Sequence, residues 1–169
     1  MPKKPPKQAL YDDIYNLDSE PELAQALGNM VVAWARAETA LVKTLSRLTG
    51  IGKNRALTAY YSIPTFQARI KFLRALVIEW DTNGFDKDAI DHVIKKLSAL
   101  SGTRNHWIHG VWSRERGSGN IVVFDFRSLG MALDRRKPVK AHDIKYHVDT
   151  VLQRVHDLRV LIQHTTLPL

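Results

Sequence analysis

Apolar residues recur every three or four positions over long stretches of the chain, which is the spacing of one face of an α-helix. The first stripe runs from Leu23 to Leu48 and predicts a continuous helix of about eight turns. Its members are Leu23, Leu27, Met30, Trp34, Ala37, Leu41, Leu45 and Leu48. A helix of this length needs packing partners, because its apolar face must be covered.

Local signals at both ends of this stripe set the expected bounds of the first helix. Ser19 and Glu22 have the spacing of a capping box, in which each side chain binds a backbone N–H of the other residue. Pro21 suits the first turn, where its missing N–H costs nothing. Gly50 and Gly52 predict the end of the helix.

Four further helices are predicted, the first as a short helix before the break at Pro64 and the other three from the same spacing. They cover about residues 54–62, 66–80, 86–109 and 141–163. Thr65 is expected to cap the second of them, since a threonine hydroxyl accepts a hydrogen bond from the first turn.

Between the last two helices the period changes to two, which is typical of strands. Residues 111–114 and 121–127 predict a hairpin, joined by a glycine-rich turn over 115–120. Because two strands alone are marginally stable, the hairpin is expected to pack on the helices. Residues 128–140 predict a basic loop.

The expected fold is therefore mainly α: a bundle of about five helices with a small β-hairpin inserted before the last helix. Residues 18–169 are predicted to form a single domain. Residues 1–17 are predicted to be a flexible N-terminal arm, because prolines at 2, 5 and 6 disfavour a helix.

Composition narrows the class of protein. The chain has 169 residues, of which 44% are hydrophobic, and this is enough for one core. It has no cysteine, so disulfides and thiolate metal sites are excluded. No apolar run approaches the thickness of a bilayer, and the basic N-terminus has no apolar region behind it. We expect a cytoplasmic protein that does not enter a membrane.

The chain is basic, with a net charge of +8 and a pI of about 9.8. Eight cations and three acids fall within residues 104–140. Two interpretations remain open for this excess: a solvated loop-rich face, or a patch that binds nucleic acid. For the second, the candidate nucleic-acid-binding residues are Arg114, Arg116, Arg135 and Arg136, and RNA is the expected partner. A regulatory protein that binds DNA is a further alternative.

The candidate chemistry is concentrated in residues 104–110, at the end of the fourth predicted helix. Asn105 and His109 are four residues apart and share one helix face, and Arg104 flanks that face. A histidine can take or give a proton near neutral pH, and an arginine can stabilise the negative charge of a phosphorane. Such a set can cleave RNA with the substrate's own 2′-OH as nucleophile and no metal. One helix supplies one such histidine, so two copies across a two-fold axis would supply an acid and a base.

A structural interpretation competes with this one. Arg104 continues an apolar stripe, where a guanidinium needs a partner or an opening to solvent. Glu38 adjoins the first stripe; it is either an ordinary surface acid or an inward carboxylate, and Arg104 is then one candidate cation for it. In that case His109 and Gly110 are ordinary features of a helix C-terminus.

The segment Arg104-Asn105-His106-Trp107-Ile108-His109 resembles the Arg-x4–6-His motif of the HEPN superfamily. The resemblance implies a small helical bundle that dimerises, and for many members a metal-independent ribonuclease of toxin–antitoxin, phage-defence or RNA-processing systems. It assigns Arg104 and His109 to the catalytic pair and Asn105 to the accessory polar position. It also implies an antitoxin protein as a candidate partner. The hairpin is not part of the minimal family bundle.

Other matches to the same spacing show that position, and not spacing alone, singles out Arg104. The pairs are Arg135 with His142, Arg136 with His142, and Arg159 with His164. The first two cross Pro138, and the third lacks a polar residue after its arginine. The histidines of the last predicted helix form no metal triad with carboxylates, and no nucleotide-binding motif is present, so neither a metal nor a cofactor is expected.

Overall fold

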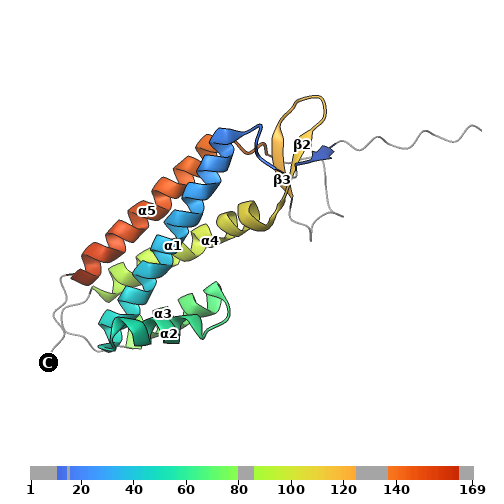
Figure 1. Cartoon of the computed structure of the whole chain (residues 1–169). Coiled ribbons are helices and arrows are strands. Elements are labelled where there is room, and N and C mark those ends of the chain that lie inside the picture. Colours follow the sequence, from blue (N-terminus) through green and yellow to red (C-terminus); the bar gives the residue numbers. More distant parts are fainter. Residues whose placement is uncertain (1–10, 15, 80–85, 125–136, 164–169) are drawn as a thin grey trace, which may run out of the picture.

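The computed structural model describes residues 11–14, 16–79, 86–124 and 137–163, and within them it contains five helices and three strands (Figure 1). The helices are α1 (Pro21–Thr49), α2 (Lys53–Tyr61), α3 (Phe66–Glu79), α4 (Lys87–His109) and α5 (Ala141–Gln163). The strands are β1 (Tyr11–Asp13), β2 (Val111–Glu115) and β3 (Ile121–Phe124). The predicted five-helix bundle with a small sheet before the last helix is confirmed.

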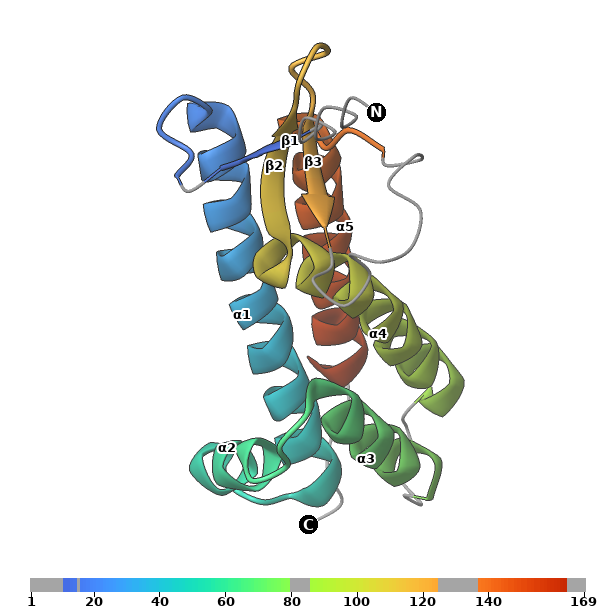
Figure 2. The same cartoon turned by 90° about the vertical axis from the view of Figure 1, so that its right-hand side faces the viewer.

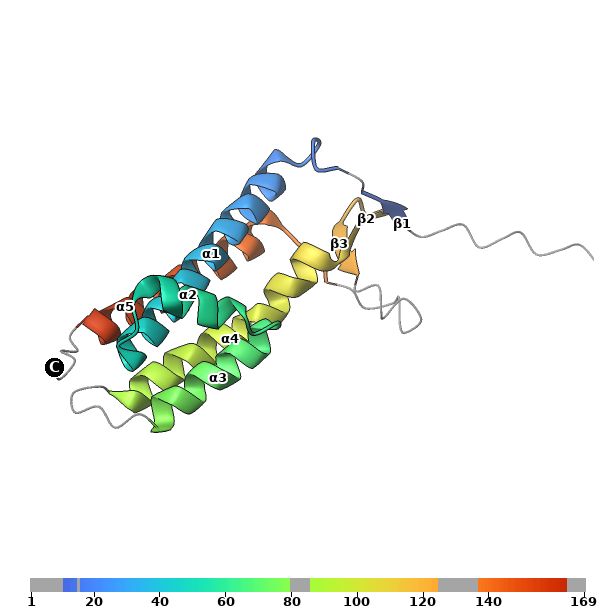
Figure 3. The ribbon, with the colours of Figure 1, turned by 60° about the horizontal axis from the view of Figure 1, so that its bottom comes forward.

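The long helices α1 and α5 lie side by side and run in the same direction (Figures 1 and 2). Helix α4 packs on α5 and carries α3 on its other side, while α2 packs against the C-terminal part of α1 (Figure 3). The predicted apolar stripe of α1 is buried throughout, from Leu23 to Leu48, apart from Leu27, which is partly buried. The sheet extends α4 at the end of the bundle where α1 and α5 begin.

The start of α1 differs from the prediction. The capping residue is Glu20, with no side-chain hydrogen bond to the first turn, so the predicted capping box of Ser19 and Glu22 does not form. The carboxylate of Glu20 instead accepts a hydrogen bond from Arg114 of β2 at 2.6 Å. Pro21 does occupy the first turn, and Gly50 ends the helix at φ 69°, a left-handed conformation that favours glycine.

The N-terminal segment also differs from the prediction of a flexible arm over 1–17. Tyr11–Asp13 forms β1, which pairs antiparallel with β2 and places Asp12 opposite Arg114. Ile14 donates its N–H to the carbonyl of Trp112 at 2.9 Å and packs on the core. Three residues are too few to produce a periodic signal, and residues 1–10 lie outside the described part of the chain.

The predicted hairpin is present with shorter strands. Trp112 pairs with Val123 across β2 and β3, and Gly117 and Gly119 take positive φ in the turn. All four residues of β3 are buried, so this strand has no solvent-facing side in spite of the predicted alternation. The predicted strand residues 125–127 and most of the basic loop lie outside the described residues.

The starts of α3 and α4 agree with simple capping rules. Thr65 caps α3, accepting the N–H of Ala68 at 3.2 Å, and Asp86 caps α4, accepting the N–H of Ala89 at 2.9 Å. None of the helices in the described ranges combines the length and the apolar composition that a membrane crossing requires.

Candidate active site at the end of α4

The residue that follows α4, Gly110, is a glycine for a steric reason. The N–H of Gly110 donates to the carbonyl of His106 at 3.0 Å, and its φ of −77° is an ordinary extended conformation. A Cβ at this position would lie 2.3 Å from Cγ1 of Val123, 2.4 Å from the carbonyl oxygen of His106 in the last turn of α4, and 2.9 Å from the carbonyl oxygen of Phe124. Glycine is required because β3 passes directly over the helix end, and not because a left-handed cap is needed.

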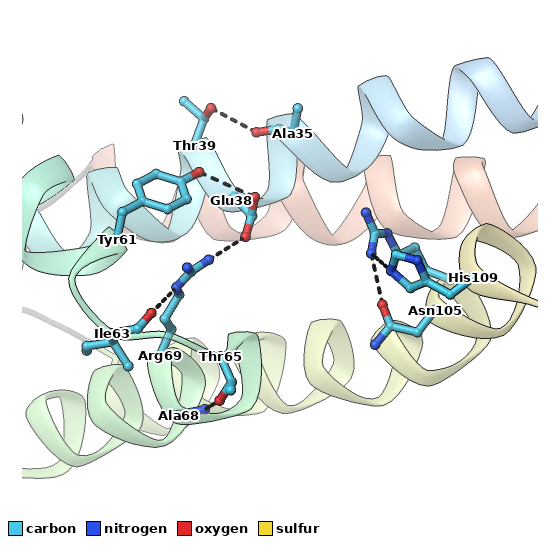
Figure 4. Close-up of polar contacts among 11 residues, drawn as sticks. Ala35, Glu38, Thr39, Tyr61, Ile63, Thr65, Ala68, Arg69, Asn105 and His109 are labelled. Atoms are coloured by element: carbon cyan, nitrogen blue, oxygen red, sulfur yellow. Dashed lines mark hydrogen bonds and ion pairs between the residues drawn. The ribbon is translucent and has the colours of Figure 1, made fainter. Parts of the chain in front are cut away.

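The last turn of α4 brings together the three residues predicted to be catalytic. Nη1 of Arg104 donates to Oδ1 of Asn105 at 2.9 Å and lies 3.4 Å from Nε2 of His109. Figure 4 shows Asn105 and His109 on the same side of the helix. Asn105 and His109 are exposed, while Arg104 is half-buried. The catalytic roles themselves remain predictions.

The contact between Arg104 and His109 has a chemical consequence. An arginine guanidinium only donates hydrogen bonds, so Nε2 of His109 is the acceptor when this contact is a hydrogen bond. The imidazole is then neutral, with its proton on Nδ1. A neutral imidazole with a lone pair on Nε2 is the form that a general base requires.

Arg104 has no carboxylate partner among the described residues. Its guanidinium lies 5.9 Å from the centre of the Trp34 ring, within the range of a cation–π contact. Its Nε–H is buried without a hydrogen-bond partner in the described part of the chain. No acid in the described ranges therefore compensates the positive charge of Arg104.

The pairing of Glu38 with Arg104 that the sequence allowed does not occur. Glu38 faces another cluster, in which Nη1 of Arg69 lies 3.1 Å from its Oε1 and the hydroxyl of Tyr61 donates to its Oε2 at 3.3 Å. Arg69 also donates from Nε to the carbonyl of Ile63 at 2.8 Å. Burial and the Glu38 carboxylate raise the pKa of the Tyr61 hydroxyl.

This cluster of Glu38, Tyr61 and Arg69 joins α1, α2 and α3, and sequence reasoning missed it. Figure 4 shows it on the same side of the bundle as the end of α4, displaced along α1. The signal that could have located it is Glu38 itself, whose position beside an apolar stripe requires a cation. No local pattern marked Arg69 as that cation, because it lies 31 residues away in the sequence.

Trp107 and His147 anchor the motif turn to α5. The Trp107 ring is buried and meets the His147 ring edge-on, with ring centres 5.2 Å apart. Its carbonyl accepts the indole N–H of Trp112 at 2.9 Å. Trp107 is thus a core residue, and its packing fixes the orientation of the turn that carries Arg104 and His109.

The predicted nucleic-acid-binding arginines on the sheet are engaged in ion pairs. Arg114 pairs with Glu20, and Arg116 binds Asp12 through both Nε and Nη2. The hydrogen bond from Arg116 holds the pKa of the Asp12 carboxyl below its usual value. These arginines hold the N-terminal segment on the sheet, and their role in nucleic-acid binding remains a prediction. Arg135 and Arg136 lie outside the described residues.

Within the ranges that the structure describes, no three histidine, aspartate or glutamate side chains are grouped as a set of metal ligands. Comparison with protein-family models, curated proteins and solved structures found no match to this chain. Any assignment of function therefore depends on the geometry at the end of α4.

Proposed function

We propose that this protein is a metal-independent endoribonuclease of the HEPN type that acts as a homodimer. The observation that carries the proposal is the state of Arg104. Its guanidinium is uncompensated by any carboxylate in the described part of the chain, and it lies beside an exposed imidazole and an exposed amide. A cation held in place without an anion is suited to receive a phosphate.

The proposed reaction uses the 2′-OH of RNA as the nucleophile. Nε2 of His109 takes the 2′-OH proton, and the 2′-oxygen attacks the adjacent phosphorus. Arg104 stabilises the added negative charge on the phosphorane oxygens. The bond from phosphorus to the 5′-oxygen then breaks, which leaves a 2′,3′-cyclic phosphate and a 5′-OH. The proton for the leaving oxygen comes from the second His109 of the dimer, which reacts as the protonated imidazolium and ends neutral while the first His109 ends protonated.

Substrate binding is expected to rearrange the contact between Arg104 and His109. A phosphate oxygen is a stronger acceptor for a guanidinium than a neutral imidazole, because it carries a negative charge. Arg104 therefore turns from His109 to the phosphate, and Nε2 becomes available as a base. Asn105, which binds Arg104 at 2.9 Å, keeps the guanidinium at the helix end during this exchange.

The test is an RNA cleavage assay in EDTA with wild type, Arg104→Ala and His109→Ala. We expect each substitution to lower the rate by at least about 100-fold, the range for loss of a general base or a charge stabiliser. His106→Ala is the matched control, because His106 is exposed in the same turn and its side chain forms no hydrogen bond with Arg104. It should cleave as wild type does.

Equal cleavage by wild type and both variants, or no cleavage of any RNA, would refute the ribonuclease.

The alternative is a non-catalytic module that binds RNA or a protein. One observation favours it: the hydrogen bonds that Arg104 makes through Nη1 go to Asn105 and His109 of the motif itself, as expected of a structural residue. In that case RNA gel shifts would persist in both variants with no product formed.

A further inference from the structure

A second concentration of positive charge lies at the opposite end of the bundle from the sheet. A pocket of about 450 Å³ opens there between the C-terminal parts of α1 and α5 and the start of α2. Figures 1 and 3 show these three elements meeting at that end. Four cations line it: Lys43, Arg47, Lys53 and Arg159. None of the residues lining it in the described part of the chain is an acid.

Among the described residues, the four cations have no anionic partner. Each of the ion pairs formed by described residues involves other cations, so the charges at this pocket repel one another without compensation. The N–H of Arg159 at Nε is buried and has no acceptor among the described residues. Four like charges around one concave site disfavour the unliganded fold and favour a bound anion.

We infer that this pocket binds a compact oligophosphate group. Four cations on three elements can surround several phosphates at once, whereas a single phosphate would leave charges unmatched. The α2 helix begins at Lys53, so its N-terminal N–H groups add to the positive potential. None of the described residues that line the pocket is aromatic. It therefore recognises the phosphate chain and not a nucleobase.

The shape of the site separates this ligand from an RNA backbone. An extended strand is bound by cations arranged in a line along a surface, with aromatic residues for its bases. Here the cations converge on one hollow, away from the end of α4 that carries Arg104 and His109. The inference is therefore independent of the proposed ribonuclease activity.

The test is isothermal titration calorimetry of the full chain with inorganic tripolyphosphate in EDTA. We expect one site per chain. Lys43→Gln/Arg47→Gln should weaken binding by at least about tenfold, because each charge-assisted hydrogen bond to phosphate is lost. Both residues are exposed, so the variant is expected to fold, and circular dichroism checks this. Lys71→Gln/Lys96→Gln, which removes two exposed cations outside the pocket, should bind within about twofold of wild type.

Two further arms identify the source of the phosphate chain. ATP should bind about as tightly as tripolyphosphate if only the phosphates are recognised, and an RNA with a 5′-triphosphate should compete through its terminus. The inference is overturned if tripolyphosphate does not bind, or if the control variant weakens binding equally. It is also overturned if ATP binds more than about tenfold tighter, or if single-stranded DNA without a terminal phosphate displaces tripolyphosphate.

Discussion

At the scale of single residues, the glycine inside α4 and the glycine that follows it differ in what a side chain would contact. Gly110 is held where β3 crosses the helix end, and a Cβ there would meet Val123 and the backbone of Phe124. Gly102 lies in the middle of α4 with no atom within 4 Å of where its Cβ would be. Glycine inside a helix costs conformational entropy, so Gly102 destabilises α4. Gly110, in contrast, is needed because a larger residue would not fit.

We predict that Gly110→Ala lowers the free energy of unfolding by about 2 kcal/mol or more, because the backbone of β3 must move away from α4. Gly102→Ala should raise it by about 0.5–1 kcal/mol. Urea unfolding followed by circular dichroism measures both changes. Equal stability of the two variants would show that β3 does not lie against the helix end.

At the scale of elements, the packing of α4 on α5 depends on a buried histidine. His147 is 6% exposed, its Nε2 has no hydrogen-bond partner among the described residues, and its ring lies against Trp107. Burial lowers the pKa of His147 below its ordinary value of 6.5. The folded chain thus keeps this imidazole neutral at a pH where the unfolded chain already protonates it.

The consequence for stability has a definite sign. The contribution of neutral His147 is fully present above pH 6.5 and is lost as the pH falls through its lower folded pKa. We predict a decrease of at most about 1.4 kcal/mol per pH unit from this one proton. In urea unfolding between pH 7.5 and 5.5, His147→Leu should show a smaller slope than wild type.

The matched control for this measurement is His92→Gln, since His92 is an exposed histidine on α4. It should keep the wild-type slope. An unchanged slope in His147→Leu would show that other groups cause the pH dependence of stability. Asp91 acts only at more acidic pH. Burial raises the pKa of its carboxyl, but hydrogen bonds from Arg74 and Lys95 lower it more, so the pKa lies below 3.8 overall.

At the scale of the whole molecule, the proposed chemistry needs more than one copy of the chain. The motif supplies one exposed histidine beside Arg104, while cleavage benefits from both a base and an acid. The structure is that of a single chain, and the motif turn with Asn105 and His109 is exposed on it. A two-fold axis near this turn would place two such turns face to face.

We predict that light scattering in solution gives twice the 19.2 kDa mass of one chain. Cleavage per chain should fall when the protein is diluted below the dissociation constant of the dimer, because the second His109 is lost. A monomer that cleaves at full specific activity at every concentration would contradict the shared site. His109→Ala, diluted in parallel, reports the background of the assay.

Much of the fold and of the candidate site could be predicted from short-range patterns in the sequence. The apolar stripes located four of the five described helices, since helical spacing and capping involve residues within one or two turns of each other. The same spacing placed Arg104, Asn105 and His109 together, because four residues along a helix bring side chains to one face. The alternation of residues 111–124 likewise indicated the hairpin.

Tertiary structure alone decided which distant residues meet. The partner of Glu38 is 31 residues away, and the partners that fix Arg114 and Arg116 are 94 and 104 residues away. Packing in space also decided the pairing of β1 with β2 and the steric need for Gly110. It likewise brought four cations together at the far end of the bundle. Such contacts depend on how the elements pack in space, and no local period of the sequence encodes the choice among many charged side chains.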